Sequence, residues 1–182
     1  MNPEIFVSSN PTIKFIEPDI KRDSPFAVEW FNGPEGKDTQ LMMGIPEKEI
    51  IKTTLELEEV KLQKFIDLDK ENKQITRMIS VDHKTIGVVW IELIKNHNVE
   101  PASIHIMIGN PEYRRKGIGS TVMKDAVDYS HSLGHMKIYS RHVVENQNIA
   151  KVFKSLGFKN DGEHYHDEGK YWQNVSKSFD EE

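Results

Sequence analysis

Residues Ile104 to Ser120 read Ile-His-Ile-Met-Ile-Gly-Asn-Pro-Glu-Tyr-Arg-Arg-Lys-Gly-Ile-Gly-Ser, and the rest of the fold can be inferred from this segment. Isoleucines alternate with other side chains over Ile104–Ile108, a period that predicts a β-strand. An Asn-Pro break, three cations and two glycines follow, and apolar residues then recur at helical spacing from Val122 to Leu133. The segment therefore predicts a strand, a cationic turn and a helix in succession.

The turn between this strand and this helix is suited to binding an anion. Backbone N–H groups at a helix N-terminus lack partners and carry a partial positive charge. Gly117 and Gly119 have no Cβ to keep a ligand away, the three preceding cations are Arg114 to Lys116, and the first acid of the helix is Asp125. A phosphate or pyrophosphate would fit there, although an ordinary surface turn with solvated cations would show the same Gly-x-Gly pattern.

Composition limits the classes of protein that this chain could represent. At 182 residues, with 37% hydrophobic and 29% charged residues, it fits one folded domain, which we place at residues 11–180 after an N-terminal segment of residues 1–10 that we expect to be loose. A net charge of −5 argues against nucleic acid as the main partner. The absence of cysteine excludes disulfides, a cysteine nucleophile and thiolate metal sites. No signal-peptide or membrane-span pattern is present, so we expect a cytoplasmic protein without a membrane partner.

Strand and helix patterns alternate along the chain. Strands are predicted at 12–16, 74–81, 85–94, 104–108 and 137–144, with a final pair at 158–164 and 171–179. Helices are predicted from Ser24-Pro25 to about residue 31, over 47–70, from Gly119 to Gly134, and over 149–156, while residues 32–46 are predicted to be a loop. The order indicates a mixed α/β (α+β) fold with a strand-helix-strand unit at its centre.

Two motifs in this order resemble those of the GCN5-related N-acetyltransferases (GNAT family), which bind acetyl-CoA and acetylate amines. The segment Arg114 to Gly119 is similar to the family's Gln/Arg-x-x-Gly-x-Gly/Ala signature. Downstream, Asn146, Ala150, Phe153 and Leu156-Gly157-Phe158 resemble the family's Asn-x-x-x-Ala-x-x-Tyr-x-x-x-Gly-Phe segment. A Rossmann turn is the rival interpretation, and it fails because Val122 stands where a third glycine would be needed.

The resemblance implies a three-layer fold and a cofactor site. The central sheet would be mixed and mostly antiparallel, with about seven strands and about four flanking helices, and it would splay at the strand Ile104–Ile108. Acetyl-CoA would be the acetyl donor, with its pyrophosphate on the turn, its pantetheine arm along the strand, and Asn146 on the other side. The implied cofactor-binding residues are Ile106, Met107, Ile108, Arg114, Arg115, Lys116, Gly117, Ile118, Gly119, Ser120, Asn146 and Phe153.

The catalytic groups are less determined than the cofactor site. Acyl transfer to an amine needs a base to make the amine neutral, and His105, on the strand beside the acyl group, is the leading candidate. Glu92 is the alternative base or amine-orienting carboxylate; either residue could instead be a packed or exposed residue of the sheet. Phe153 lacks the hydroxyl of the family's usual Tyr, which protonates the leaving thiolate. The alternatives are Tyr139 or Tyr113 as the acid, a water as the acid, or direct expulsion of the thiolate.

The function predicted from the sequence is an acetyl-CoA-dependent N-acetyltransferase acting on a primary amine of a small molecule, such as a polyamine or an aminoglycoside. A peptide or protein amine is the alternative acceptor, and a CoA-binding domain without turnover is the alternative class. Trp30, Trp90 and Trp172 are either core residues or the floor of an acceptor pocket. No metal site is predicted, since Gly134 ends the helix between His131 and His135. The resemblance is compatible with a homodimer.

Overall fold

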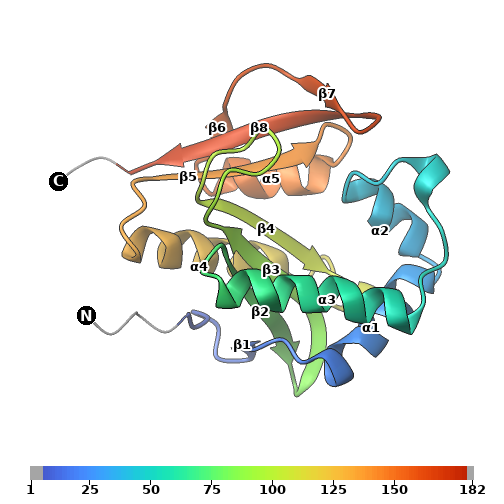
Figure 1. The fold of residues 1–182 in the computed structure, drawn as a ribbon. Helices are drawn as coiled ribbons and strands as arrows, with labels where there is room; N and C mark the ends of the chain where they lie inside the picture. The colour runs from blue at the N-terminus through green and yellow to red at the C-terminus, as the bar shows by residue number, and fades with distance from the viewer. Residues whose placement is uncertain (1–5, 180–182) are drawn as a thin grey trace.

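The computed structural model describes residues 6–179, which form one eight-stranded sheet with helices on both faces (Figure 1). The strands are β1 (Ile13–Ile16), β2 (Gln74–Val81), β3 (Lys84–Glu92), β4 (Ser103–Ile108), β5 (Lys137–Val143), β6 (Lys159–Asn160), β7 (Tyr165–Asp167) and β8 (Lys170–Ser178). The helices are α1 (Ile20–Asn32), α2 (Gly36–Met42), α3 (Leu55–Lys70), α4 (Ile118–Ser132) and α5 (Gln147–Ser155), with 3₁₀ turns η1 (Glu47–Glu49) and η2 (Pro111–Tyr113). The predicted mixed, mostly antiparallel sheet is confirmed, with eight strands rather than about seven and five α-helices rather than about four.

The sheet opens between β4 and β5, at the place predicted from the sequence. The strand order is β1-β2-β3-β4-β5-β8-β6, with β7 paired to β8, and β4–β5 is the parallel pair. Within residues 6–179 these two strands share a single registered pair, Ser103 with Tyr139, supplemented by a hydrogen bond from Ser140 Oγ to the Ile104 carbonyl at 2.6 Å. Beyond that point the strands diverge, so the edge of β4 that carries Ile106 and Ile108 faces a gap.

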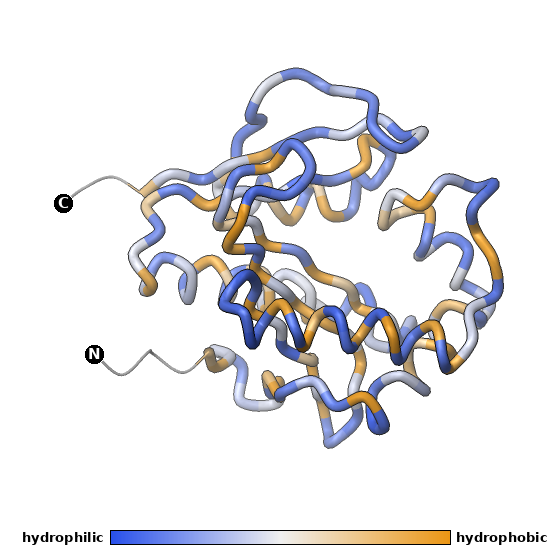
Figure 2. Tube along the Cα trace, in the orientation of Figure 1, coloured by the Kyte–Doolittle hydropathy of each residue, from blue (hydrophilic) through white to orange (hydrophobic). Residues whose placement is uncertain are grey.

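Each face of the sheet carries its own apolar core. The core under α4 and α5 includes Ile79, Val89, Ile104, Val122, Met123 and Phe153. The core under α1 and α3 includes Trp30, Leu62, Met78, Val88 and Met107. Figure 2 shows the apolar residues gathered along the central strands, with polar residues in most loops. Because side chains alternate along a strand, His105 and Trp90, which pair across β3 and β4, lie on the α1 and α3 face.

Two predicted helices were wrong in their boundaries, and one helix was not predicted. Helix α1 begins at Ile20 rather than at Ser24-Pro25, because the Asp19 side chain caps it by accepting from the Arg22 N–H at 2.8 Å. The predicted 47–70 helix begins only at Leu55, where Thr54 caps it. Helix α2 occupies part of the predicted 32–46 loop. It packs so close to α1 that a Cβ at Gly36 would lie 2.0 Å from the backbone oxygen of Phe31. The formation of this short helix therefore depends on its packing against α1.

The two ends of the described chain also differ from expectation. Residues 6–10 are not loose, because Phe6 is 6% exposed and stacks on Phe15 and Tyr129, and Ser8 donates to Asp125 at 2.6 Å. Residues 1–5 of the predicted N-terminal segment lie outside the described residues. The predicted strand at 158–164 was wrong in its length: only β6 lies within it, β7 begins just beyond it, and Gly162 between them has a φ of +85°. Among residues 6–179, no helix combines the length and apolar character needed to span a bilayer.

Candidate active site

His105 and Glu92, which the sequence proposed as alternative bases, form one cluster. His105 Nε2 lies 3.5 Å from Glu92 Oε2 and 2.9 Å from Ser103 Oγ, and the two side chains are 16% and 14% exposed. The Trp90 indole stacks on the His105 ring with a centroid distance of 5.1 Å. A carboxylate beside Nε2 favours the tautomer that carries its proton there, which leaves Nδ1 with the lone pair. The cluster therefore pairs a histidine with a carboxylate that can orient its ring.

The environment of Glu92 keeps its carboxyl group ionised. Burial acts to raise the pKa of Glu92, but hydrogen bonding and the charge of His105, with hydrogen bonds from Asn96 and Trp90, outweigh it and lower the pKa to about 2. Asn96 Nδ2 donates to Glu92 Oε1 at 3.0 Å. Glu92 is thus suited to orienting His105 and stabilising its protonated form, and poorly suited to taking up a proton itself near neutral pH.

The lowered pKa of Glu92 predicts how the fold responds to acid. A carboxyl group whose pKa falls on folding stabilises the native state fully above its ordinary pKa of 4.5, and this contribution is lost as the pH drops toward 2. The contribution is on the order of 2 kcal/mol once solvent screening is allowed for. In Glu92→Gln, the free energy of unfolding should therefore depend less steeply on pH over this window, as measured by denaturant titrations. Parallel curves for the two proteins would contradict this expectation.

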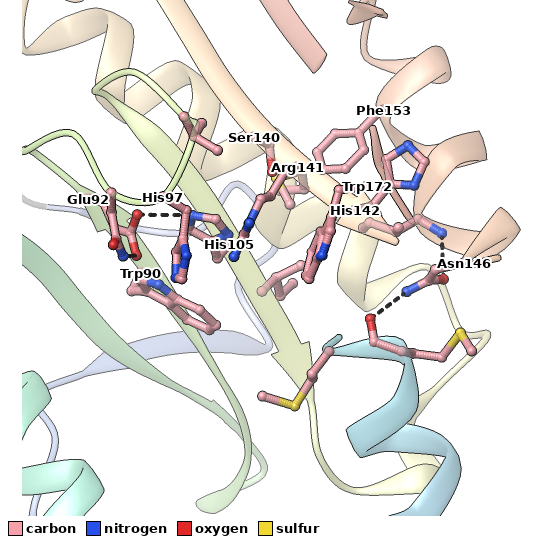
Figure 3. Close-up of a pocket in the computed structure, with 17 residues that line it drawn as sticks. Trp90, Glu92, His97, His105, Ser140, Arg141, His142, Asn146, Phe153 and Trp172 are labelled. Carbon is pink, nitrogen blue, oxygen red and sulfur yellow. Dashed lines mark hydrogen bonds and ion pairs between the residues drawn. The ribbon is translucent and has the colours of Figure 1, made fainter. Parts of the chain in front are cut away.

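A cavity of about 210 Å³ lies against this cluster at the gap between β4 and β5 (Figure 3). Its lining includes His105, Glu92 and Ile106 from one side and Asn146 and Phe153 from the other. The structure therefore brings together five residues that the sequence had marked on three separate segments. Trp90 and Trp172 also line it, whereas Trp30 lines a different cavity on the α1 and α3 face.

The turn before α4 has the features of an anion site. Gly117 caps the helix with a φ of +80°, and Arg115 also has a positive φ of 57°, as in the concave backbone turns that bind anions. The first helical hydrogen bond runs from Thr121 N to the Gly117 carbonyl, so the N–H groups of residues 118–120 have no intrahelical partner. A Cβ built on Gly117 meets nothing within 4 Å, and the first turn holds no acid. The backbone is thus open to a ligand.

Arg114, predicted to contact the cofactor, has protein partners for its guanidinium. It donates to the Ile108 and Gly109 carbonyls at 2.8 and 3.1 Å, and to Thr39 Oγ1 and Glu35 Oε2 at 2.8 and 2.9 Å. These bonds fasten the end of β4 to α2. Arg115 and Lys116 are exposed beside it. A direct contact between the Arg114 side chain and a cofactor remains a prediction.

Asn146 and Phe153 are placed by α5. Asn146 is the N-cap of this helix, where its Oδ1 accepts from the Ile149 N–H at 3.3 Å and its Nδ2 donates to the Met42 carbonyl at 3.4 Å. Phe153 is 2% exposed, and its ring packs against Phe158 and His142. Burial lowers the pKa of His142, whose Nδ1 lies 2.9 Å from the Val143 carbonyl.

Several residues of the cavity were not anticipated from the sequence. Arg141 is 9% exposed; its guanidinium lies over the Trp172 ring at 3.9 Å and donates to Asp167 at 3.0 Å. His97 Nδ1 lies 3.6 Å from Asp167, and Glu168 completes a group whose ligand atoms lie within 4.8 Å of one another. Arg141 already compensates the Asp167 charge, so this group is poorly suited to a cation. These residues could not be identified as a group from the sequence, because β5 and the β7–β8 turn are separated along the chain and come together only in the folded protein.

Comparison with known proteins identifies the family. A family model described as an acetyltransferase (GNAT) domain matches residues 17–159. The chain belongs to the GNAT acetyltransferase family. Among the GNAT relatives, an uncharacterized N-acetyltransferase of Methanocaldococcus jannaschii is 31% identical over 84 residues, 43% of this chain and 36% of that protein. The spermidine N(1)-acetyltransferase of Escherichia coli (strain K12) is 30% identical over 94 residues, 50% of this chain and 48% of that protein.

The structural similarity extends over nearly the whole chain, whereas the sequence similarity to the two curated relatives covers half of the chain or less. The chain spans about half or less of the length of these two curated relatives. The crystal structure of the microcin C7 self-immunity acetyltransferase in complex with acetyl-CoA and AMP superposes with a TM-score of 0.75 at 19% identity, covering 93% of this chain and 94% of that chain. The predicted GNAT fold is therefore confirmed.

Proposed function

We propose that this chain transfers the acetyl group of acetyl-CoA to the primary amine of a small molecule, with His105 as the general base and Glu92 as the residue that positions it. The proposal rests chiefly on the His105–Glu92 pair, which lines the cavity at the gap between β4 and β5. The same strand, β4, leads directly into the turn that is suited to an anion. One strand thus carries the base and ends at the cofactor turn.

The residues at the turn fit the pyrophosphate of acetyl-CoA. The N–H groups of residues 118–120 precede the first helical hydrogen bond, and the open space at Gly117 lets a phosphate approach the backbone. The gap beside Ile106 and Ile108 would take the pantetheine arm, because that edge of β4 has no strand partner in the described chain after Ser103. When bound, acetyl-CoA supplies a thioester that an amine can attack.

His105 would accept the proton that the amine must lose. We assign its proton to Nε2, which faces Glu92 and Ser103, so that Nδ1 is the ring nitrogen available to the amine, directly or through a water. The ionised Glu92 then stabilises the imidazolium that forms, in the way a carboxylate orients a catalytic histidine in other enzymes. Glu92 is therefore assigned a positioning role rather than a role as base.

A small-molecule acceptor is supported by the size of the cavity and by one relative. The cavity of about 210 Å³ is bounded by α2, β3, β5 and α5, and Met42 and Met43 cover one side. The curated name of the Escherichia coli relative assigns it to spermidine, which is a small amine. These observations favour a free amine over the amino terminus of a folded protein.

The proposed activity can be tested by thiol release from acetyl-CoA with a panel of primary amines, and by mass spectrometry of the products. We expect CoA release that depends on the amine and an acetylated product of equal amount. Binding of CoA without acetylation of any amine in the panel would contradict the proposal and would favour a CoA-binding domain without turnover.

We propose that neither tyrosine considered as a proton donor acts in the reaction. Neither Tyr139 nor Tyr113 lines the cavity: Tyr139 pairs with Ser103 where β4 and β5 meet, and Tyr113 lies in η2 against the α4 core. We therefore expect kcat for Tyr139→Phe and Tyr113→Phe to equal that of the wild type within error, measured by thiol release at saturating substrates. A large decrease in kcat for either variant, with an unchanged melting temperature, would restore that tyrosine as the acid.

A further inference from the structure

A second cavity lies on the same face of the sheet as His105 and Glu92. It has a volume of about 170 Å³, is partly open to solvent, and lies between α1, α3 and strands β2 to β4. Half of its fourteen lining residues are aromatic or methionine, among them Trp30, Phe31, Phe65, Met78 and Met107, and Asp23, Ser24, Glu58 and Lys61 also line it. An engineered apolar cavity of about 150 Å³ stays dry and binds benzene, so this space has the size and the chemistry for one aryl group.

This apolar cavity adjoins the cavity of the candidate active site. Trp90 and Met43 line both. The Trp90 indole contacts the His105 ring at a centroid distance of 5.1 Å and the Phe65 ring at 5.3 Å. One aromatic ring therefore separates the base from the apolar cavity, and the flexible Met43 side chain forms the other part of the boundary. A molecule with its amine beside His105 would have to pass Trp90 and Met43 to reach the apolar cavity.

One polar group in this cavity has no partner. Ser24 lines it and is 1% exposed, and its Oγ is the one buried side-chain oxygen or nitrogen without a hydrogen bond among the described residues. Buried hydroxyl groups are almost always hydrogen-bonded, because an unmade bond is costly. A ligand in this cavity could supply the hydrogen-bond partner that the Ser24 hydroxyl lacks.

The charged groups at this cavity are already paired. Asp23 is held by Arg22 at 2.7 Å, and Glu58 accepts from Lys61 at 2.6 Å and also from Thr53. A second ammonium group would enter carbon walls without a free carboxylate and would lose its hydration. The cavity therefore disfavours a polyamine, whose chain carries further charges.

We infer that the acetyl acceptor is a primary amine carrying an aryl-sized apolar group, which binds between α1, α3 and the sheet, with a polar substituent that hydrogen-bonds to Ser24. This inference rests on the proposed function, since it takes the amine to be acetylated beside His105. It replaces the polyamine or aminoglycoside suggested by sequence with an arylalkylamine.

Binding can be measured without turnover. Calorimetric titrations into the CoA-loaded protein would compare 2-phenylethylamine and tyramine with ethanolamine and spermidine. We expect the two aryl amines to bind at least about tenfold more tightly, as expected when an apolar pocket accepts a matching group. Equal or tighter binding of spermidine would overturn the inference.

Two variants locate the aryl group. Ala27→Leu places a larger side chain in the cavity and should lower the ratio of kcat/KM for 2-phenylethylamine to kcat/KM for ethanolamine by about tenfold or more. Ser24→Ala removes the hydroxyl without changing the packing, and it should abolish the tighter binding that we expect for tyramine over 2-phenylethylamine. Melting temperatures near that of the wild type would show that both variants fold.

The outcomes separate this inference from the proposed function. If amines are acetylated but the ratio is unchanged in Ala27→Leu, the inference fails and the acetyltransferase proposal stands. If the aryl amines bind, and Ala27→Leu weakens their binding, but no amine is acetylated, the cavity is a binding site and the acetyltransferase proposal fails.

Discussion

Gly117→Asp and Gly119→Asp should each abolish measurable binding of CoA while the protein still folds. An aspartate in the first turn of α4 would place a negative charge where the pyrophosphate is expected. Two unit charges at 4 Å repel by about 4 kcal/mol near a protein surface, which corresponds to at least about a 100-fold loss of affinity. Isothermal titration with CoA measures this loss. Affinity equal to that of the wild type in both variants would remove the turn from the cofactor site.

The chain offers a matched control for the strain that the substitution introduces. Gly117 has a φ of +80° with no atom within 4 Å of a built Cβ, and Gly134, just past the other end of α4, has a φ of +93° with the same open surroundings. Gly134→Asp should therefore carry a similar backbone cost of about 1 kcal/mol. We expect it to bind CoA like the wild type. A similar loss of CoA affinity in Gly134→Asp would show that the loss in Gly117→Asp comes from backbone strain and not from the added charge.

His105→Gln should reduce kcat/KM by about 100-fold or more, the range expected when a general base is removed. Glutamine keeps a hydrogen bond to Glu92 but cannot take up a proton near neutral pH. The affinity for CoA should be unchanged, because the turn before α4 is not altered. The pH dependence of kcat/KM should lose the rise that reports deprotonation of the base. An unchanged rate and pH profile would exclude His105 from the mechanism.

Glu92→Gln distinguishes positioning from base catalysis. If Glu92 only orients His105, this variant should show a smaller decrease in kcat/KM than His105→Gln, and it should keep a pH-dependent rise that is shifted in position. A larger decrease in Glu92→Gln than in His105→Gln, with the pH dependence lost, would make Glu92 the base.

The parts of the fold predicted from sequence are those that local pattern determines. The alternation over Ile104–Ile108 and the two glycines before α4 were sufficient to place the strand, the turn and the helix. Helix α2 could not be predicted in this way, because Gly36 allows close packing on α1, and that packing is invisible in a local pattern.

Some residues that line the candidate site were named from the sequence, but their geometry was not. His105 and Glu92 were weighed as alternatives, whereas the register of β3 and β4 places them 3.5 Å apart. Arg114 was expected at the cofactor, and its guanidinium instead joins the end of β4 to α2. The apolar cavity depends on how α3 lies across the sheet, so no single segment of sequence could indicate it.

A crystal structure with CoA bound tests the central claim most directly. We predict the pyrophosphate within hydrogen-bond distance of the backbone N–H groups of residues 115–120, and the thiol sulfur in the gap between β4 and β5, within reach of His105 directly or through one water. A pyrophosphate bound away from the turn, or a sulfur on the α4 and α5 face of the sheet, would contradict the account.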